Sequence, residues 1–228
     1  GGAACGGAPT VTLREAFARS CNTAFVEMGI ATGREALVDQ AEALGIDENM
    51  EVPLPVAPST IGPIPDGAAL GQTSIGQRDV ALTPLENASI AATIANGGVR
   101  MEPYLVERLQ GPDLAVLEET TPESLGQAIA PEVAATLTDL MVGAEDFAGG
   151  QGIPGVKIAS KTGTAEHGSD PRNTPPHTWY IAFAPAQQPT IAIAVIVEDG
   201  GDRALAATGG SVAAPIGRAV ISAGLQGG

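Results

Sequence analysis

The sequence of 228 residues has little positive charge. It contains two lysines, Lys157 and Lys161, and its 11 Lys and Arg face 26 Asp and Glu, which gives a formal net charge of −15. Nucleic acids and anionic lipid surfaces are bound through Lys and Arg that neutralise phosphates, so this balance argues against both as partners. An anionic ligand would need a local positive site, and Lys161 is the candidate for it.

Aromatic residues and long apolar runs are also scarce. Aromatic residues make up 3% of the chain and hydrophobic residues 44%, so the core must be built mainly from Ala, Val, Ile and Leu. The longest apolar runs, residues 179–186 and 191–197, are far shorter than the roughly 18 to 20 residues that span a bilayer. Residues 1–10 show no signal-peptide pattern, so we expect a cytosolic protein or an excerpt of a longer chain.

Metal-binding side chains are few. Cys5, Cys21, His167 and His177 are the only Cys and His residues, and their spacing matches no metal-ligand pattern. The sequence therefore predicts no metal site and no cofactor. For the cysteines two interpretations stay open at this point: unrelated small residues, or a disulfide that closes a short loop in an oxidising compartment.

Helix signals dominate the first two thirds of the chain. Capping boxes begin at Thr12 and Thr83, each with a Glu three residues later. Residues 46–82 are rich in Pro and Gly and are predicted to form a long ordered loop. The predicted helices span residues 13–33, 34–44, 84–96, 131–147 and, near the end of the chain, 211–223.

Strand signals follow. Residues 99–109 are predicted to form a strand or hairpin, and residues 156–166, 178–185 and 190–198 an antiparallel meander. Helices, then consecutive strands, then a closing helix are typical of the α+β class, with an antiparallel sheet flanked by helices.

The run Lys-Thr-Gly-Thr at residues 161–164 is the first candidate site. In an extended strand, Thr162 and Thr164 share one side about 7 Å apart, and Gly163 lets another backbone approach. A peptide added along this edge would place its terminal carboxylate near two hydroxyls and an ammonium. Alternation places the Lys161 side chain on the opposite side of the strand from Thr162 and Thr164. Lys161 can therefore help to bind the ligand only if it lies in the wall of a cleft. The alternative is a surface lysine before a glycine turn.

The second candidate is Ser-Cys-Asn at residues 20–22. Residues i and i+2 do not face each other on a regular helix, so Ser20 and Asn22 serve one site only if the helix breaks between them. The alternative is a helical serine followed by an unrelated capping asparagine.

Together, these motifs resemble those of the serine acyltransferases that bind penicillin. Residues 20–22 and 161–163 match the S-x-N and K-T-G elements of that superfamily. Further stretches resemble class B penicillin-binding protein transpeptidase domains in the same order: SIGQRDVALTPLENASIAATIANGG (74–98), EPYLV (102–106), SKTGTAE (160–166), TWYIAFAP (178–185) and GGSVAAPI (209–216). The stretch VTLREAFARSCNTAF (11–25) is most similar to the penicillin-binding protein A group. The resemblance covers nearly the whole chain.

The resemblance implies a penicillin-binding/serine β-lactamase-like transpeptidase fold and a peptidoglycan D,D-transpeptidase that forms an acyl-enzyme and is a target of β-lactams. It assigns catalytic roles to three residues. Ser20 would relay a proton towards the leaving amine, Asn22 would hydrogen-bond the amide side of the donor peptide, and Lys161 would polarise Ser20.

The same resemblance assigns substrate binding to Thr162, Gly163 and Thr164. The two hydroxyls would bind the carboxylate of a terminal D-Ala or of a β-lactam, and the Thr164 N–H would form half of an oxyanion hole. It also implies a location on the extracytoplasmic face of the bacterial plasma membrane, which favours a Cys5–Cys21 disulfide beside the S-x-N motif. The implied partners are the D-Ala-D-Ala stem peptide, β-lactam antibiotics, and proteins of cell division or elongation.

The chain departs from the family at the first motif, Ser-x-x-Lys, which supplies the acylated serine. Pro154 and Ile158 stand three residues before the two lysines, so the motif does not occur. We expect residues 1–228 to be the C-terminal portion of one transpeptidase domain, with the nucleophile, a non-catalytic domain and a membrane anchor upstream. The 228 residues alone are expected not to acylate.

Two other functions remain. A non-catalytic or β-lactam-sensing module would keep the ligand cradle and lack the nucleophile by design. A β-lactamase would need a deacylating base. The sequence does not identify such a base. Glu166 could act as one and His167 could line the rim of the cleft, but a solvated carboxylate and a solvated loop histidine are more typical of these positions.

Overall fold

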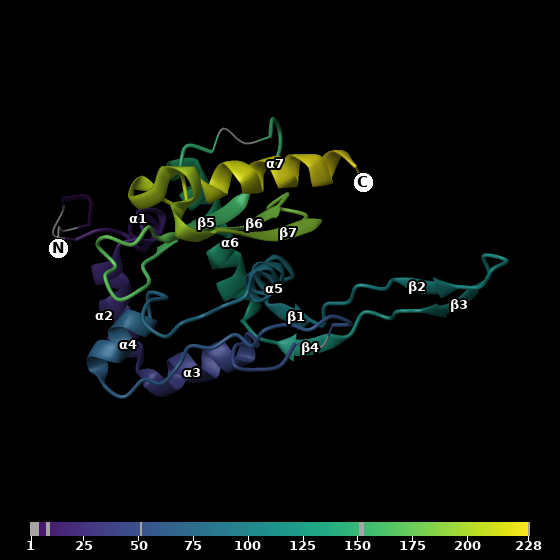
Figure 1. The fold of residues 1–228 in the computed structure, drawn as a ribbon, viewed down its shortest axis with the longest axis horizontal. Helices are drawn as coiled ribbons and strands as arrows, with labels where there is room; N and C mark the ends of the chain where they lie inside the picture. Colours follow the sequence, from purple (N-terminus) through teal and green to yellow (C-terminus); the bar gives the residue numbers. More distant parts are fainter. Residues whose placement is uncertain (1–4, 8–9, 51, 151–152, 228) are drawn as a thin grey trace.

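A three-stranded antiparallel sheet forms the centre of the protein. In a computed structural model that describes residues 5–7, 10–50, 52–150 and 153–227, the strands β5 (Ala159–Ala165), β6 (His177–Ala184) and β7 (Ile191–Val197) pair in the order β5-β6-β7. Helix α7 (Ala213–Gln226) lies over one face, and α5 (Pro84–Ala95) and α6 (Pro131–Phe147) lie on the other side (Figure 1). The predicted α+β class is confirmed.

The core on both faces of the sheet is mainly aliphatic, as the composition predicts. Under α7, Ile193, Ala213 and Ile221 pack around Tyr180, which is fully buried. On the opposite face, Ile94 of α5 and Met141 of α6 pack with Ala159 and Phe183. The sheet is therefore covered on both faces.

The N-terminal helices differ from the prediction in one important place. The single helix expected over residues 13–33 is two helices, α1 (Leu13–Ala18) and α2 (Asn22–Thr32), because Ser20 adopts a left-handed backbone with φ of 52°. The capping box at Thr12 is present, with both reciprocal bonds to Glu15. A short 3-10 turn, η1 (Cys5–Gly7), precedes α1, and α3 (Arg34–Ala43) follows α2.

The loop predicted over residues 46–82 was partly wrong, because it contains α4 (Gly67–Thr73). Asp66 caps this helix by accepting a hydrogen bond from the Ala69 N–H at 2.8 Å. Seven residues, two of them glycine, are too few to show a helical period. Helix α4 packs against α2, and Leu70 joins a small cluster with Ile46 and Ile64.

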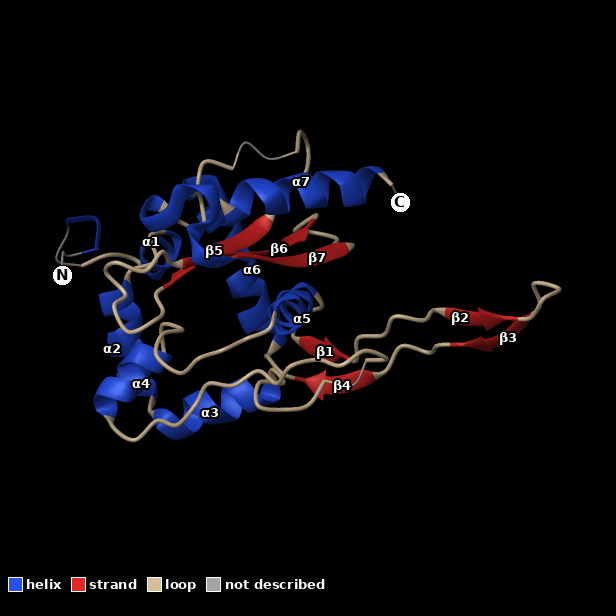
Figure 2. Ribbon diagram, viewed as in Figure 1, coloured by secondary structure: helices blue, strands red, loops and turns tan. Residues whose placement is uncertain are grey.

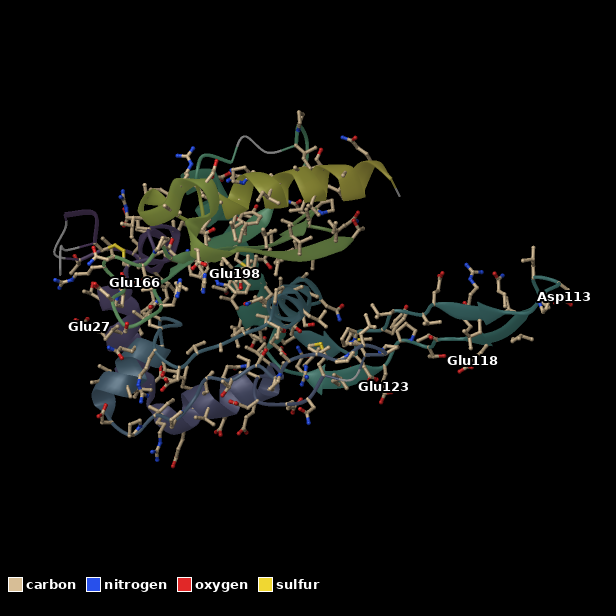
Figure 3. All side chains as sticks on the ribbon, viewed as in Figure 1. Glu27, Asp113, Glu118, Glu123, Glu166 and Glu198 are labelled. Carbon is tan, nitrogen blue, oxygen red and sulfur yellow. A yellow bond between two sulfur atoms is a disulfide. The ribbon has the colours of Figure 1, made fainter. Side chains whose placement is uncertain are left out.

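Residues 99–127 form two short ladders that extend from the body as an arm (Figure 2). Strand β1 (Val99–Met101) pairs with β4 (Ser124–Gln127), and β2 (Arg108–Gln110) pairs with β3 (Val116–Glu119). The predicted strand or hairpin at 99–109 therefore contains two strands, each with a partner further along the chain. Figure 3 shows Asp113 and Glu118 on this arm and Glu27 on the body, so acidic side chains are spread over the molecule.

After β7, a kinked 3-10 segment, η2 (Glu198–Ala206), leads back to the sheet and into α7. The predicted closing helix and the three predicted meander strands are present, with ends that differ by a few residues. Over the ranges that the structure describes, no helix combines the length and apolarity needed to cross a bilayer.

Candidate active site

Strand β5, which carries Lys-Thr-Gly-Thr, is an edge strand. In the described part of the chain it pairs with β6 alone, with Thr162 opposite Tyr180 and Thr164 opposite Thr178. Helix α6 crosses the start of β5, because Met141 packs with Ala159 on one face while Glu145 bonds to Ser160 on the other. An edge strand can pair with an incoming strand along its second side.

The structure joins the two motifs through Lys161. Its Nζ donates to Ser20 Oγ at 2.5 Å, and to the Thr162 carbonyl oxygen at 2.8 Å. The ammonium also lies 5.8 Å from the centre of the Phe17 ring. As predicted from strand alternation, Lys161 points away from the face of Thr162 and Thr164 and reaches the wall formed by α1 and α2.

The environment of Lys161 changes its protonation. Burial lowers the pKa of Lys161 from 10.5 to about 8, because the charged form loses hydration. Lys161 is thus mostly an ammonium at neutral pH, but it gives up its proton more easily than an exposed lysine. A cation in contact with a serine hydroxyl is suited to polarising that hydroxyl and to moving a proton through it.

The helix break that the site requires is present between α1 and α2. Ser20 is exposed, and its left-handed backbone costs about 1 to 2 kcal/mol for a residue other than glycine. Residues in such conformations occur often at functional sites. Asn22 opens α2 on the other side of the break and is also exposed. A disulfide joins Cys5 to the buried Cys21, with their Cα atoms 5.5 Å apart, so it ties down the residue between Ser20 and Asn22.

The end of β5 is held by a second segment of the same chain. The N–H of Gly209 donates to Thr164 Oγ1 at 3.3 Å, and a Cβ at Gly209 would lie 2.5 Å from the carbonyl oxygens of Gly163 and Trp179. The backbone approach predicted at Gly163 therefore occurs, but on the face of the sheet and by Gly209. On the other face, a Cβ at Gly163 would lie 3.2 Å from the Cβ of Trp179.

Sequence reasoning missed a buried polar cluster at the start of β5. Glu145 of α6 accepts hydrogen bonds from Ser160, Tyr180 and Arg218, which lie on β5, β6 and α7. The available signal was the position of Glu145, four residues after Met141 on the apolar stripe of its helix. A charged residue on such a stripe needs a partner inside the protein.

His167 lies in the loop after β5, as expected, but its side chain is only partly exposed and packs against other residues. Its ring stacks on His177 with centroids 3.8 Å apart and planes 8° apart, and its Nε2 lies 3.1 Å from Asp199 Oδ1. One ligand atom from each of these three residues lies within 4.8 Å of the others. Lone pairs in nearly parallel ring planes do not converge on one ion, so this arrangement does not form a metal site as it stands.

Residues 3–222 match the family model of the penicillin binding protein transpeptidase domain. With the edge strand and the lysine–serine contact, this match shows that the chain belongs to the penicillin-binding protein transpeptidase family. The chain is 67% identical to the peptidoglycan D,D-transpeptidase PbpA of Mycolicibacterium smegmatis, over 99% of this chain and 46% of that protein. It is also 67% identical to PbpA of Mycobacterium tuberculosis, over 100% of this chain and 46% of that protein.

Solved structures agree with this assignment. Penicillin-binding protein A of M. tuberculosis, as its ceftriaxone acyl-enzyme complex, superposes with a TM-score of 0.93 at 66% identity, covering 96% of this chain and 49% of that one. A crystal structure of the same protein superposes with a TM-score of 0.92. The predicted transpeptidase fold is confirmed. The chain spans about half the length of the relatives that it matches.

Proposed function

We propose that this chain forms the substrate-binding part of a peptidoglycan D,D-transpeptidase that is acylated by β-lactams. The observation that carries the proposal is the hydrogen bond from Lys161 to Ser20, beside an edge strand with hydroxyls at residues 162 and 164. The relatives that are named D,D-transpeptidases, and the neighbour captured as an acyl-enzyme, support the same chemistry.

Each site residue has a role in this proposal. The donor peptide adds to the free edge of β5, with its terminal carboxylate held by Thr162 and Thr164 and its amide held by Asn22. The positive charge of Lys161 strengthens this anion binding in a chain whose net charge is −15. The Thr164 N–H stabilises the oxyanion that forms during acylation. Ser20, polarised by Lys161, relays to the amine of the departing D-Ala the proton that the attacking serine hydroxyl loses.

The acylated serine belongs to a part of the protein outside these 228 residues. No Ser-x-x-Lys occurs in the sequence, whereas the family's chemistry requires a serine nucleophile. Residues 1–228 would then be the C-terminal portion of one transpeptidase domain. Because cross-linking takes place in the cell wall, the active site would face the extracytoplasmic side, and partners in division or elongation would act there.

The test is D-alanine release by the whole protein from a synthetic peptide ending in D-Ala-D-Ala, with a second peptide amine as acceptor. We expect release coupled to cross-linked product, lost in Lys161→Met and retained in Lys157→Met, a matched change at the exposed lysine. Covalent labelling by a fluorescent penicillin without any D-alanine release would refute the transpeptidase assignment and favour the sensing module. If the whole protein shows neither penicillin labelling nor D-alanine release, the proposed function is refuted entirely.

A further inference from the structure

A buried carboxylate ties together the four elements that meet at the start of β5. The Glu145 side chain is 4% exposed, and three donors converge on its two oxygens. Oε2 accepts from Ser160 Oγ at 2.5 Å and from the Tyr180 hydroxyl at 3.0 Å, while Oε1 accepts from Arg218 Nε at 2.6 Å. The roles proposed above for the site residues assign nothing to this cluster.

The partners of Glu145 are fixed as donors. Burial raises the pKa of Tyr180 well above its ordinary value, so the phenol keeps its proton. Burial by itself lowers the pKa of Arg218, but the hydrogen bond and the charge of Glu145 raise it on balance, so a guanidinium faces the carboxylate. A buried ion pair with two further donors is rigid, because each displacement leaves a charged group without its partner.

The cluster acts on the strand that carries the site. As an edge strand, β5 has ladder hydrogen bonds on one side only, so its position depends on contacts from other elements. Ser160 is 1% exposed and is held by Glu145 from the face of α7. The next residue, Lys161, points to the opposite face and contacts Ser20. Tyr180, the second donor, lies directly opposite Thr162 in the ladder.

We propose that Glu145 is a positioning residue for the acylation site: by holding Ser160, it sets the placement of Lys161 against Ser20 and of Thr162 at the strand edge. The inference rests on the proposed function, since its effect is read in acylation. Glu145 itself touches neither substrate nor Ser20.

The pH dependence of acylation distinguishes a positioning role of Glu145 from a role in stability alone. Lys161 owes its lowered pKa to burial. If acylation needs the Lys161 ammonium, it falls at alkaline pH as Lys161 loses its proton. A β5 strand that is free to shift exposes the ammonium to water, so the pKa of Lys161 moves back towards 10.5 and this fall in acylation moves to higher pH. A variant that is only less stable keeps this alkaline fall in acylation, the alkaline limb of the pH profile, at the same pH.

The test measures acylation of the whole protein by a fluorescent penicillin across pH 6 to 10. In Ser160→Ala, we expect the acylation rate constant to fall about tenfold, because one hydrogen bond to a charged group is lost. The non-covalent dissociation constant should rise as well, because Thr162 and Lys161 also bind the ligand carboxylate. The alkaline limb should move upward. Glu145→Gln should show a larger loss. The matched control is Glu86→Gln, a second buried glutamate, which lies in the first turn of α5 and outside this cluster.

The inference would be overturned if Ser160→Ala is acylated at the same rate as the unchanged protein and with the same pH profile. A lower rate with an unmoved alkaline limb would overturn it too, because it indicates a role in stability alone. If Glu145→Gln does not fold, Ser160→Ala and Tyr180→Phe decide, since both keep the ion pair with Arg218. An unchanged protein that is not labelled at all would refute the proposed function, and this inference with it.

Discussion

Replacing Lys161 by methionine should remove a buried charge that lowers the free energy of unfolding at neutral pH. The drop of its pKa from 10.5 to about 8 corresponds to about 3 kcal/mol near pH 7, at 1.36 kcal/mol for each tenfold step. Between about pH 8 and pH 10.5 the unfolded chain binds more protons at this residue than the folded chain, so the contribution of Lys161 to stability rises with pH across that window. By pH 10 about 1 kcal/mol of the cost remains.

The measurement is the free energy of unfolding in urea, for the whole protein and for Lys161→Met, at pH 7, 8, 9 and 10. The free energy of the unchanged protein minus that of the variant should rise by about 2 kcal/mol from pH 7 to pH 10, because methionine does not titrate. Lys157→Met is the matched control and should show no such trend, since Lys157 is exposed. A difference that is flat with pH would refute the burial argument. A difference that falls with pH would show that Lys161 is held by an anion instead.

Three further changes test other parts of the site. Thr164→Val should weaken non-covalent binding of a β-lactam about tenfold, because a hydroxyl donor to its carboxylate is lost, and unchanged binding would exclude Thr164 from that role. Gly209→Ala should lower the free energy of unfolding by about 2 kcal/mol, since its Cβ would press on two backbone carbonyls, whereas Gly210→Ala meets no atom within 4 Å and should be neutral. Replacing Cys5 and Cys21 by serine should cost about 3 kcal/mol of stability for a loop of this length and slow acylation, and an unchanged melting temperature would contradict that estimate.

Much of the fold could be predicted because its signals are local. The capping boxes at Thr12 and Thr83 predicted helix starts that the structure confirms. The two threonine side chains accept hydrogen bonds from the backbone N–H groups of Glu15 and Glu86. The alternation of β5 also placed Lys161 on the wall opposite Thr162. By contrast, α4 was missed, because seven residues with one capping aspartate contain too little of a period.

The contacts that complete the site are not local. Ser20 meets Lys161 across 141 residues of sequence, and nothing around Ser20 signals a left-handed backbone, which glycine or asparagine would suggest. Only the requirement that Ser20 and Asn22 share a site pointed to a helix break. Glu145 was visible as a charge on an apolar stripe, but its partner Arg218 lies 73 residues away, and no spacing rule connects them.

The central claim is that Lys161 and Ser20 work together in acylation, and the rate of labelling by a fluorescent penicillin tests it most directly. With the whole protein at pH 7, Lys161→Met should be acylated at least about a hundredfold more slowly than Lys157→Met, because the variant can neither polarise Ser20 nor support proton transfer. Lys157→Met should label at the rate of the unchanged protein. Equal rates for the two variants would contradict the account.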